Sequence, residues 1–297
     1  MHTYTQQLPV VNTPTLQSSS MILRLHISMY TGRKADKKTQ QEVLTGKGAR
    51  SKGAASVYKS LFAGDQDLDS ITAFASHARR RVSAMTVPWG DNGDRLLATK
   101  SFFDVSAELS SLRVEFEARV KLFSHNYGTK IGNAAFALGD LFDRNEYPHP
   151  DEITHKFAFG YSFEPLPDSG DFRVDLHNDA LDMLRASYQK ASDQRLEAAM
   201  QDVWSRVIEE TTRLRDKMIV PEQGNRPRIF ETTLDGFKEL IGSLDALNIT
   251  NDPQLEIIRT QLHNALDPVD IDSLRESDSV RGAVKEQMQR VLDKFSM

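Results

Sequence analysis

Apolar residues recur at helical spacing along most of the chain, and they predict two long helices. Over residues 97–143 they step by three or four positions, although Gly128 and Gly132 interrupt this segment and predict a kink. At about 1.5 Å per residue, a helix of this length would exceed roughly 60 Å. Over residues 178–219 the apolar spacing is close to a heptad repeat, which is typical of helices that pack along their length.

Shorter helices are predicted on either side of these two. Residues 34–43 and 67–87 carry helical patterns, and Asp69 is placed to cap the second helix. Three more helices are predicted towards the C-terminus, over residues 232–247, 252–266 and 277–295. Helix therefore dominates the predicted secondary structure.

Strand patterns are few and short. Residues 21–29 alternate apolar and polar side chains, as a strand does, although so short a run could equally begin a helix. Residues 157–167 and 171–176 are the best further candidates, and the Pro-Asp-Ser-Gly sequence at 167–170 predicts a turn that joins them in a small hairpin. Residues 88–94 are predicted to form another turn.

These elements predict a mainly α fold of the α+β type. We expect long antiparallel helices, a small β-hairpin or sheet and a C-terminal helical subdomain. The predicted parts are a flexible N-terminal arm over 1–20, a basic region with the long-helix core over 21–220, and, after a linker, the C-terminal subdomain over 228–297. The long helices either pack against each other within one chain or leave surface for a second chain, and we expect a homo-oligomer.

The charge of the chain is distributed unevenly. The formal net charge is −5, but residues 1–100 carry 14 Lys/Arg against 7 Asp/Glu, a balance of +7. The rest carries 23 Lys/Arg against 35 Asp/Glu, a balance of −12. One basic end is typical of a chain that meets a polyanion.

Several classes of protein are disfavoured. The absence of cysteine excludes disulfides and thiolate sites, and it favours a reducing compartment. No apolar run approaches the ~18 residues of a membrane span, so we expect a cytoplasmic protein without a membrane partner. The Gly-Lys-Gly sequence at 46–48 lacks the Walker spacing, and no GxSxG, HExxH or GxGxxG occurs. We predict no catalytic residue, no cofactor and no enzymatic activity.

Metal binding is also disfavoured by spacing. His149 and His155 are the only two histidines near each other, and they lie in a predicted loop. Four carboxylates gather around the predicted hairpin without the spacing of a calcium loop: Asp168, Asp171, Asp175 and Asp179. We predict no metal site, with a two-metal nuclease left open as a rival hypothesis.

Basic and aromatic side chains are interleaved in the N-terminal third. Cations that follow phosphates and planar rings that stack on bases are what single-strand binding needs. The candidate binding residues are Arg33, Lys34, Lys37, Lys38, Lys47, Arg50, Lys52, Lys59, Arg79, Arg80, Arg81, Tyr30, Tyr58 and Trp89. The three consecutive arginines point about 100° apart on a helix and predict a broad positive collar. In the alternative interpretation the charges only aid solubility, and nearby Phe62 and Phe74 are core residues.

Two short motifs resemble a family of phage proteins. The first is Tyr30, Gly32, Arg33 and Lys34, with tyrosine where the family usually has tryptophan; the second, Phe159, Gly160 and Tyr161, follows a long helix. Among proteins related to this family, residues 20–220 are similar to the single-stranded-DNA-binding RNA polymerase cofactors of podoviruses that carry a giant virion polymerase. The resemblance implies a homo-oligomeric protein of the host cytoplasm that coats single-stranded DNA and assists the phage RNA polymerase.

The leading hypothesis is therefore a sequence-tolerant single-stranded-DNA-binding protein. The main alternative is a helical scaffold or adaptor for an ATPase or a virion component, which would not bind nucleic acid. A contiguous positive surface would favour the first, and dispersed charges would favour the second.

Overall fold

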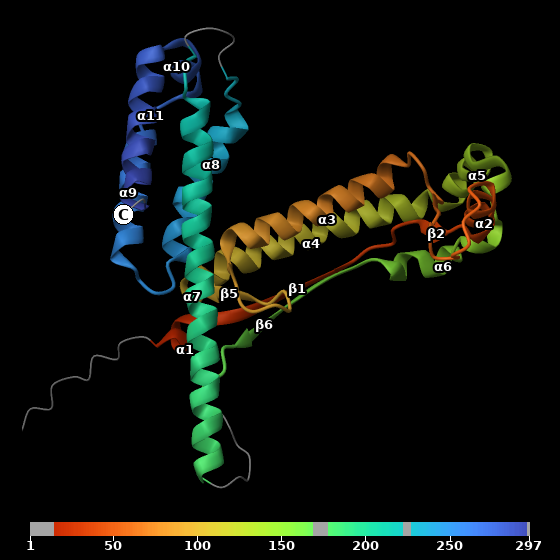
Figure 1. The fold of residues 1–297 in the computed structure, drawn as a ribbon, viewed down its shortest axis with the longest axis horizontal. Coiled ribbons are helices and arrows are strands. Elements are labelled where there is room, and N and C mark those ends of the chain that lie inside the picture. Colours follow the sequence, from red (N-terminus) through yellow and green to blue (C-terminus); the bar gives the residue numbers. More distant parts are fainter. Residues whose placement is uncertain (1–14, 169–177, 222–226, 296–297) are drawn as a thin grey trace, which may run out of the picture. The chain divides into compact units, whose positions relative to one another are not determined.

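A computed structural model describes residues 15–168, 178–221 and 227–295. The fold is mainly helical with small antiparallel sheets, as predicted (Figure 1). The chain divides into two compact units: unit 1 holds residues 1–24, 83–105 and 163–297, and unit 2 holds residues 25–82 and 106–162. The predicted division after residue 220 is not the one that the contacts give. Four elements run from one unit into the other: β1 (Ser20–Ser28), α3 (Gln66–Met85), α4 (Phe102–His125) and β6 (Ala158–Pro165).

The sheet of unit 1 has the strand order β4-β5-β1-β6, where β4 is Val87–Pro88 and β5 is Arg95–Ala98. Strand β1 is confirmed, and it pairs antiparallel with β5, Ser20 opposite Ala98 and Leu23 opposite Arg95. The predicted strand 157–167 is also confirmed, but its neighbour is β1; the predicted hairpin partner 171–176 lies outside the described residues. The predicted turn 88–94 is the tip of the β4–β5 hairpin.

Five α-helices follow β6 in unit 1 within the described ranges. The long predicted helix is confirmed as α7 (Asn178–Lys217). The others are α8 (Glu231–Leu247), α9 (Pro253–Leu266), α10 (Ile271–Glu276) and α11 (Asp278–Leu292). Buried apolar residues of α7 join one core with α8, α9, α11 and the sheet, so the C-terminal helices are not a separate subdomain (Figure 1). The short α10, capped by Asp270, was not predicted.

In unit 2, α3 and α4 lie antiparallel and side by side (Figure 1). Arg81 pairs with Glu108 at 2.9 Å, and further along Arg119 covers the ring of Phe74 at 4.3 Å. The cap of α3 is Asp65, which accepts a bond from the Leu68 backbone amide, so the predicted capping role of Asp69 is wrong.

The predicted helix over 97–143 is wrong at its start and in its continuity. Strand β5 occupies residues 95–98, and α4 begins only at Phe102. The helix is interrupted at Asn126, after which α5 (Tyr127–Leu138) begins, so the break precedes both Gly128 and Gly132. Both glycines lie within α5, and the helical pattern across this break is carried by two helices.

An aromatic cluster forms the core of unit 2 near the start of α5. The ring of Phe62 lies 5.3 to 5.7 Å from those of Phe123, Tyr127 and Tyr147. The Tyr147 hydroxyl donates to the Leu61 carbonyl at 2.9 Å, which satisfies the one polar group of that ring. This cluster anchors the segment that connects β1 to the basic region.

Gly32 is required at the entry to that region. Its φ is +60°, and a Cβ there would lie 3.1 Å from Leu68 Cδ2 and 3.3 Å from Phe62 Cδ2. Its carbonyl accepts the Leu61 amide at 2.7 Å. A side chain at this position would both strain the backbone and push into the core.

The basic region folds as a small module over residues 33–60, here named the basic module. It consists of β2 (Arg33–Ala35), α2 (Lys37–Gly46) and β3 (Tyr58–Ser60). The predicted helix 34–43 begins three residues late because Arg33–Ala35 pairs with Tyr58–Ser60 instead. Asp36 caps α2 by accepting from the Thr39 and Lys38 amides, which together lower its pKa. The predicted loop 45–53 starts at Lys47.

The last residues of the predicted arm over 1–20 have regular secondary structure. Residues 1–14 lie outside the described residues, while Leu16–Ser19 form a single helical turn, α1, and Ser20 opens β1. Among the helices of the described residues, none is long and apolar enough to cross a membrane.

Candidate nucleic-acid interface

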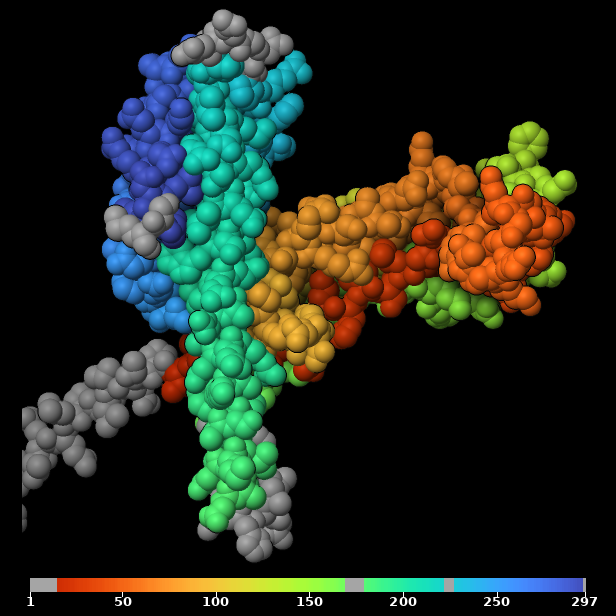
Figure 2. Space-filling view, viewed as in Figure 1, coloured from red at the N-terminus to blue at the C-terminus, as the bar shows by residue number. Residues whose placement is uncertain are grey.

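The basic module presents an exposed set of cations with little acidic compensation. The exposed cations are Arg33, Lys34, Lys37, Lys38, Lys47, Arg50 and Lys52. Of the two carboxylates in the module, Asp36 is buried as the cap of α2, which leaves Glu42 exposed. None of these seven makes an ion pair within the described part of the chain, and Arg33 lies over the ring of Tyr58. Figure 2 shows the module in orange, open to solvent on the face drawn.

The unit that contains the basic module carries a positive formal charge, and the other unit carries a negative one. Unit 2 carries 17 Lys/Arg against 13 Asp/Glu, a formal charge of +4, and unit 1 carries 20 against 29, a formal charge of −9. Unit 2 is therefore the basic unit, and within it the basic module supplies eight of the 17 cations. A concentrated positive surface of this kind attracts polyanions, and this attraction weakens as the salt concentration rises.

Tyr58 is the aromatic side chain of this surface. It is 58% exposed, and the guanidinium of Arg33 lies 5.5 Å from its ring centroid. Tyr58 stands opposite Ala35 in the two-stranded ladder, and Arg33 stands opposite Ser60, so both side chains emerge on the same face. The arrangement offers a planar ring for a base and a cation beside it for the adjoining phosphate.

Lys59 does not belong to this surface, contrary to the prediction. Its side chain is only 11% exposed, its Nζ lies 2.7 Å from a Glu146 carboxylate oxygen, and it donates to the Leu141 carbonyl at 2.6 Å. The cavity beside it, of about 560 Å³, is lined by Lys37, Lys38 and Lys59 and by five carboxylates, so Lys37 and Lys38 have acidic residues near them on this side of the module. Excess negative charge makes this cavity unsuitable for a phosphate.

Two of the three aromatic candidates are also corrected. Trp89 is 5% exposed in the core of unit 1, and it cannot receive a base there. Tyr30 is half-buried with its ring edge-on to Phe62, and burial raises the pKa of its hydroxyl. Phe62 and Phe74 are buried, so the core interpretation of those two residues is confirmed.

The three arginines of α3 have different surroundings. Arg79 donates to the Ile27 carbonyl at 3.0 Å, and Arg81 is held by Glu108. Arg80 is exposed and has no ion-pair partner among the described residues. Arg81 is therefore the member of the predicted collar whose charge is paired, whereas Arg80, and Arg79 with its bond to a carbonyl, are exposed without an ion pair among the described residues.

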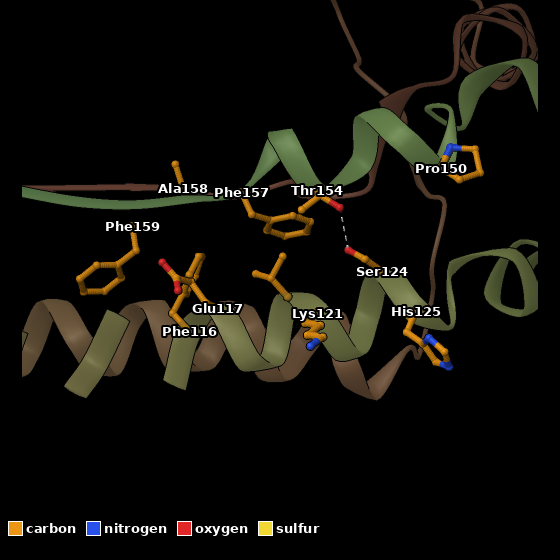
Figure 3. A pocket seen from close by; sticks show the side chains of 11 residues that line it. Phe116, Glu117, Lys121, Ser124, His125, Pro150, Thr154, Phe157, Ala158 and Phe159 are labelled. Atoms are coloured by element: carbon orange, nitrogen blue, oxygen red, sulfur yellow. Dashed lines mark hydrogen bonds between the residues drawn. The ribbon is translucent and has the colours of Figure 1, made fainter. Parts of the chain in front are cut away.

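A pocket of about 490 Å³ in unit 2 was missed by the sequence analysis. It lies between α4 and the segment from α6 (Pro150–Ile153) to β6 (Figure 3). Its walls are aromatic and aliphatic, and its rim is polar, with a hydrogen bond of 3.3 Å from Thr154 to Ser124 closing one end. Lys121 and His125 stand one helical turn apart at the rim. The lining comes from segments 25 to 43 positions apart, which no local pattern reveals.

Metal chemistry finds no support in the geometry. Within the described ranges no three His, Asp, Glu or Cys side chains converge as a metal site would require. The carboxylates expected around a hairpin lie partly outside those ranges, since residues 169–177 are not described.

Comparison of the chain with protein-family models, curated proteins and solved structures finds no match.

Proposed function

We propose that the chain is a sequence-tolerant single-stranded-DNA-binding protein whose main contact surface is the basic module. The observation that carries the proposal is the set of seven exposed cations without an ion pair among the described residues, in the same small module that exposes the ring of Tyr58. The same residues would be an electrostatic cost to the module if no anion met them, because like charges on a small domain repel one another.

The chemistry favours a single strand over a duplex. Lysines and arginines that meet phosphates release counterions, which supplies affinity without reading sequence. An exposed tyrosine ring needs the face of an unstacked base, and a duplex does not offer that face. Stacking also tolerates every base, so the expected binding is weakly selective for sequence.

The biological role in this proposal is a transcription cofactor of a phage RNA polymerase, and it rests on the family resemblance. By binding unpaired strands, the protein would shift the duplex-opening equilibrium of a promoter by mass action. Unit 1, with a formal charge of −9, is the part available for a protein partner. In its α7, Met183 is 75% exposed and Leu184 is 38% exposed, which supports pairing with a second copy.

The competing function is a helical scaffold or adaptor without nucleic-acid binding. The exposed apolar residues of α7 and Phe230, which is 54% exposed, are compatible with it. It differs from the first proposal in one measurable respect, because the cations of the basic module would then have no ligand.

The deciding experiment is fluorescence anisotropy of the full chain with a labelled strand of about 30 nucleotides, its duplex and an RNA of the same sequence, over a salt series. Preferential binding of the single strand that weakens steeply with salt supports the proposal. Absence of binding at low salt refutes it and leaves the scaffold.

A further inference from the structure

A cavity of about 570 Å³ in unit 1 is lined by three arginines. Its lining residues within the described part of the chain are Pro227, Arg228, Ile229, Phe230, Arg275 and Arg281, and no carboxylate is among these six. Three guanidinium groups around one cavity are notable here because unit 1 as a whole is acidic. The local charge is opposite to that of its unit, so a specific anion is the ligand that the site's chemistry fits.

Arg281 is the buried member of the three. It is 3% exposed, and none of the described carboxylates forms an ion pair with it. Its Nε donates to the Leu274 carbonyl, and its two terminal nitrogens reach the Pro227 carbonyl only at 3.4 and 3.5 Å. Since a guanidinium has five N–H groups, at least two have no acceptor. A buried charge without a counter-charge is costly, and a bound anion would remove that cost.

The N-terminus of α8 opens onto the same cavity. Its N-cap residue is Phe230, which makes no side-chain capping bond, and Phe230 and Ile229 both line the cavity. The N-cap side chain therefore accepts none of the first backbone amides of this 17-residue helix, although the Thr233 amide donates to the Phe230 carbonyl at 2.9 Å. The helix dipole adds partial positive charge there. Glu231, in the first turn, is not part of the lining.

The other two arginines of the cavity come from the segment just before α8 and from α10. Arg228 is exposed and has no ion-pair partner in the described ranges. Arg275 donates through Nε to the Ile229 carbonyl at 3.4 Å and reaches the exposed Asp272 at 3.3 Å, so its pairing is long and screened. Both guanidiniums are able to turn towards an anion at low cost.

We propose that this cavity binds the phosphate monoester of a nucleotide-sized ligand, a nucleoside 5′-monophosphate in the first instance. Guanidinium forks and helix-terminal amides together are the donor set that phosphate oxygens take. The cavity exceeds what a single phosphate group fills, and the half-exposed ring of Phe230 at its edge offers a surface on which the base stacks. The site lies in unit 1 and does not depend on single-strand binding by the basic module.

The test is isothermal titration of the full chain with adenosine 5′-monophosphate, adenosine and inorganic phosphate, at constant ionic strength. The monophosphate should bind, phosphate should bind more weakly, and adenosine should not bind measurably. A variant that lacks the basic-module cations is then titrated with a 5′-phosphorylated oligonucleotide and with its 5′-hydroxyl form. Tighter binding of the phosphorylated form would show that the cavity also accepts the phosphate at the end of a strand.

Two variants and a control locate the site. Arg228→Met, at an exposed position, should weaken monophosphate binding at least about tenfold through loss of a charge-assisted contact. Arg281→Met should abolish it, and its thermal unfolding is measured in parallel because the residue is buried. Lys285→Met removes an exposed cation from the next turn of α11 and should leave binding unchanged.

The outcomes that overturn the proposal are specific. Equal weakening by Arg228→Met and Lys285→Met would reduce the effect to net charge. If inorganic phosphate binds as tightly as the monophosphate, the nucleoside part contributes nothing to binding, and a nucleotide is excluded as the specific ligand. No binding of either anion would exclude the site, whatever the anisotropy of single strands shows, because the two surfaces carry different residues.

Discussion

The loop that follows α2 provides the sharpest test of the basic module. Lys47, Arg50 and Lys52 are exposed, and none of the three forms an ion pair within the described residues. Replacing all three with glutamine removes three positive charges and no described ion pair. Exposed substitutions of this kind change stability by roughly 0.5 kcal/mol or less, so the variant should fold and unfold like the parent.

The expected loss of binding follows from counterion release. Each phosphate contact with a single strand contributes about 0.7 to the slope of log K against log salt. If all three cations meet phosphates, the slope should become shallower by roughly 2. Extrapolated from 1 M to about 0.1 M salt, the same factor weakens binding by about 100-fold.

The assay is anisotropy of a labelled single strand over a salt series, with a matched triple variant as control. Lys190, Lys285 and Arg290 are exposed cations of unit 1, and replacing them with glutamine changes the net charge equally. The control should keep the parent slope. If the two triple variants lose the same slope, the affinity comes from net charge, and the assignment of the loop as a phosphate contact is refuted.

Three further substitutions separate binding residues from structural ones. Tyr58→Leu should weaken single-strand binding by about 1–3 kcal/mol while Tyr58→Phe retains it, and similar losses in both would exclude stacking. Trp89→Ala should lower the free energy of unfolding by about 3–5 kcal/mol in chemical denaturation, and unchanged stability would contradict its core position. Lys59→Met leaves the Glu146 carboxylate without its cation, so it should lower the midpoint of denaturation and leave the salt slope of binding unchanged; a shallower slope would return Lys59 to the interface.

The elements that the sequence predicted well are those with a long uninterrupted period. Helix α7 repeats its apolar positions over 40 residues, and α8 and α9 begin and end close to the predicted positions because their apolar faces are regular. The strand β1 was also recoverable from its apolar–polar alternation, although Ile22 and Leu23 are buried on opposite faces, so only its second half has one face more exposed than the other. In each of these helices, the local spacing of apolar residues agrees with the side on which the helix packs.

The errors arise where a distant segment decides the structure. Leu97 and Ala98 fall within the predicted helix over 97–143, but pairing with β1 makes them part of a strand. Lys34 fits the start of a helix, yet the ladder with β3 holds it extended. Such pairings join positions 23 to 78 residues apart, and local propensity is overridden by the hydrogen bonds of the ladder.

The candidate site shows the same limitation at the level of single side chains. Lys34 and Lys59 stand opposite each other in the β2–β3 ladder, and the two residues are of the same type. Lys59 is enclosed by Glu146 and the Leu141 carbonyl, whereas Lys34 is exposed. The partner comes from residues more than 80 positions away, so no count of basic residues distinguishes a structural lysine from one that is open to a ligand.

The unpaired cations also predict that salt acts on the free module and on its complex in opposite directions. Because the exposed lysines of the basic module repel one another, added salt should stabilise the module when no strand is bound. A bound strand neutralises the same charges, and its stabilisation falls as salt weakens binding. Amide exchange of α2, measured with and without a single strand, should therefore be slowed by the strand at low salt and converge at high salt. If the strand slows exchange equally at every salt concentration, neutralisation of these cations is not what couples binding to the stability of the module.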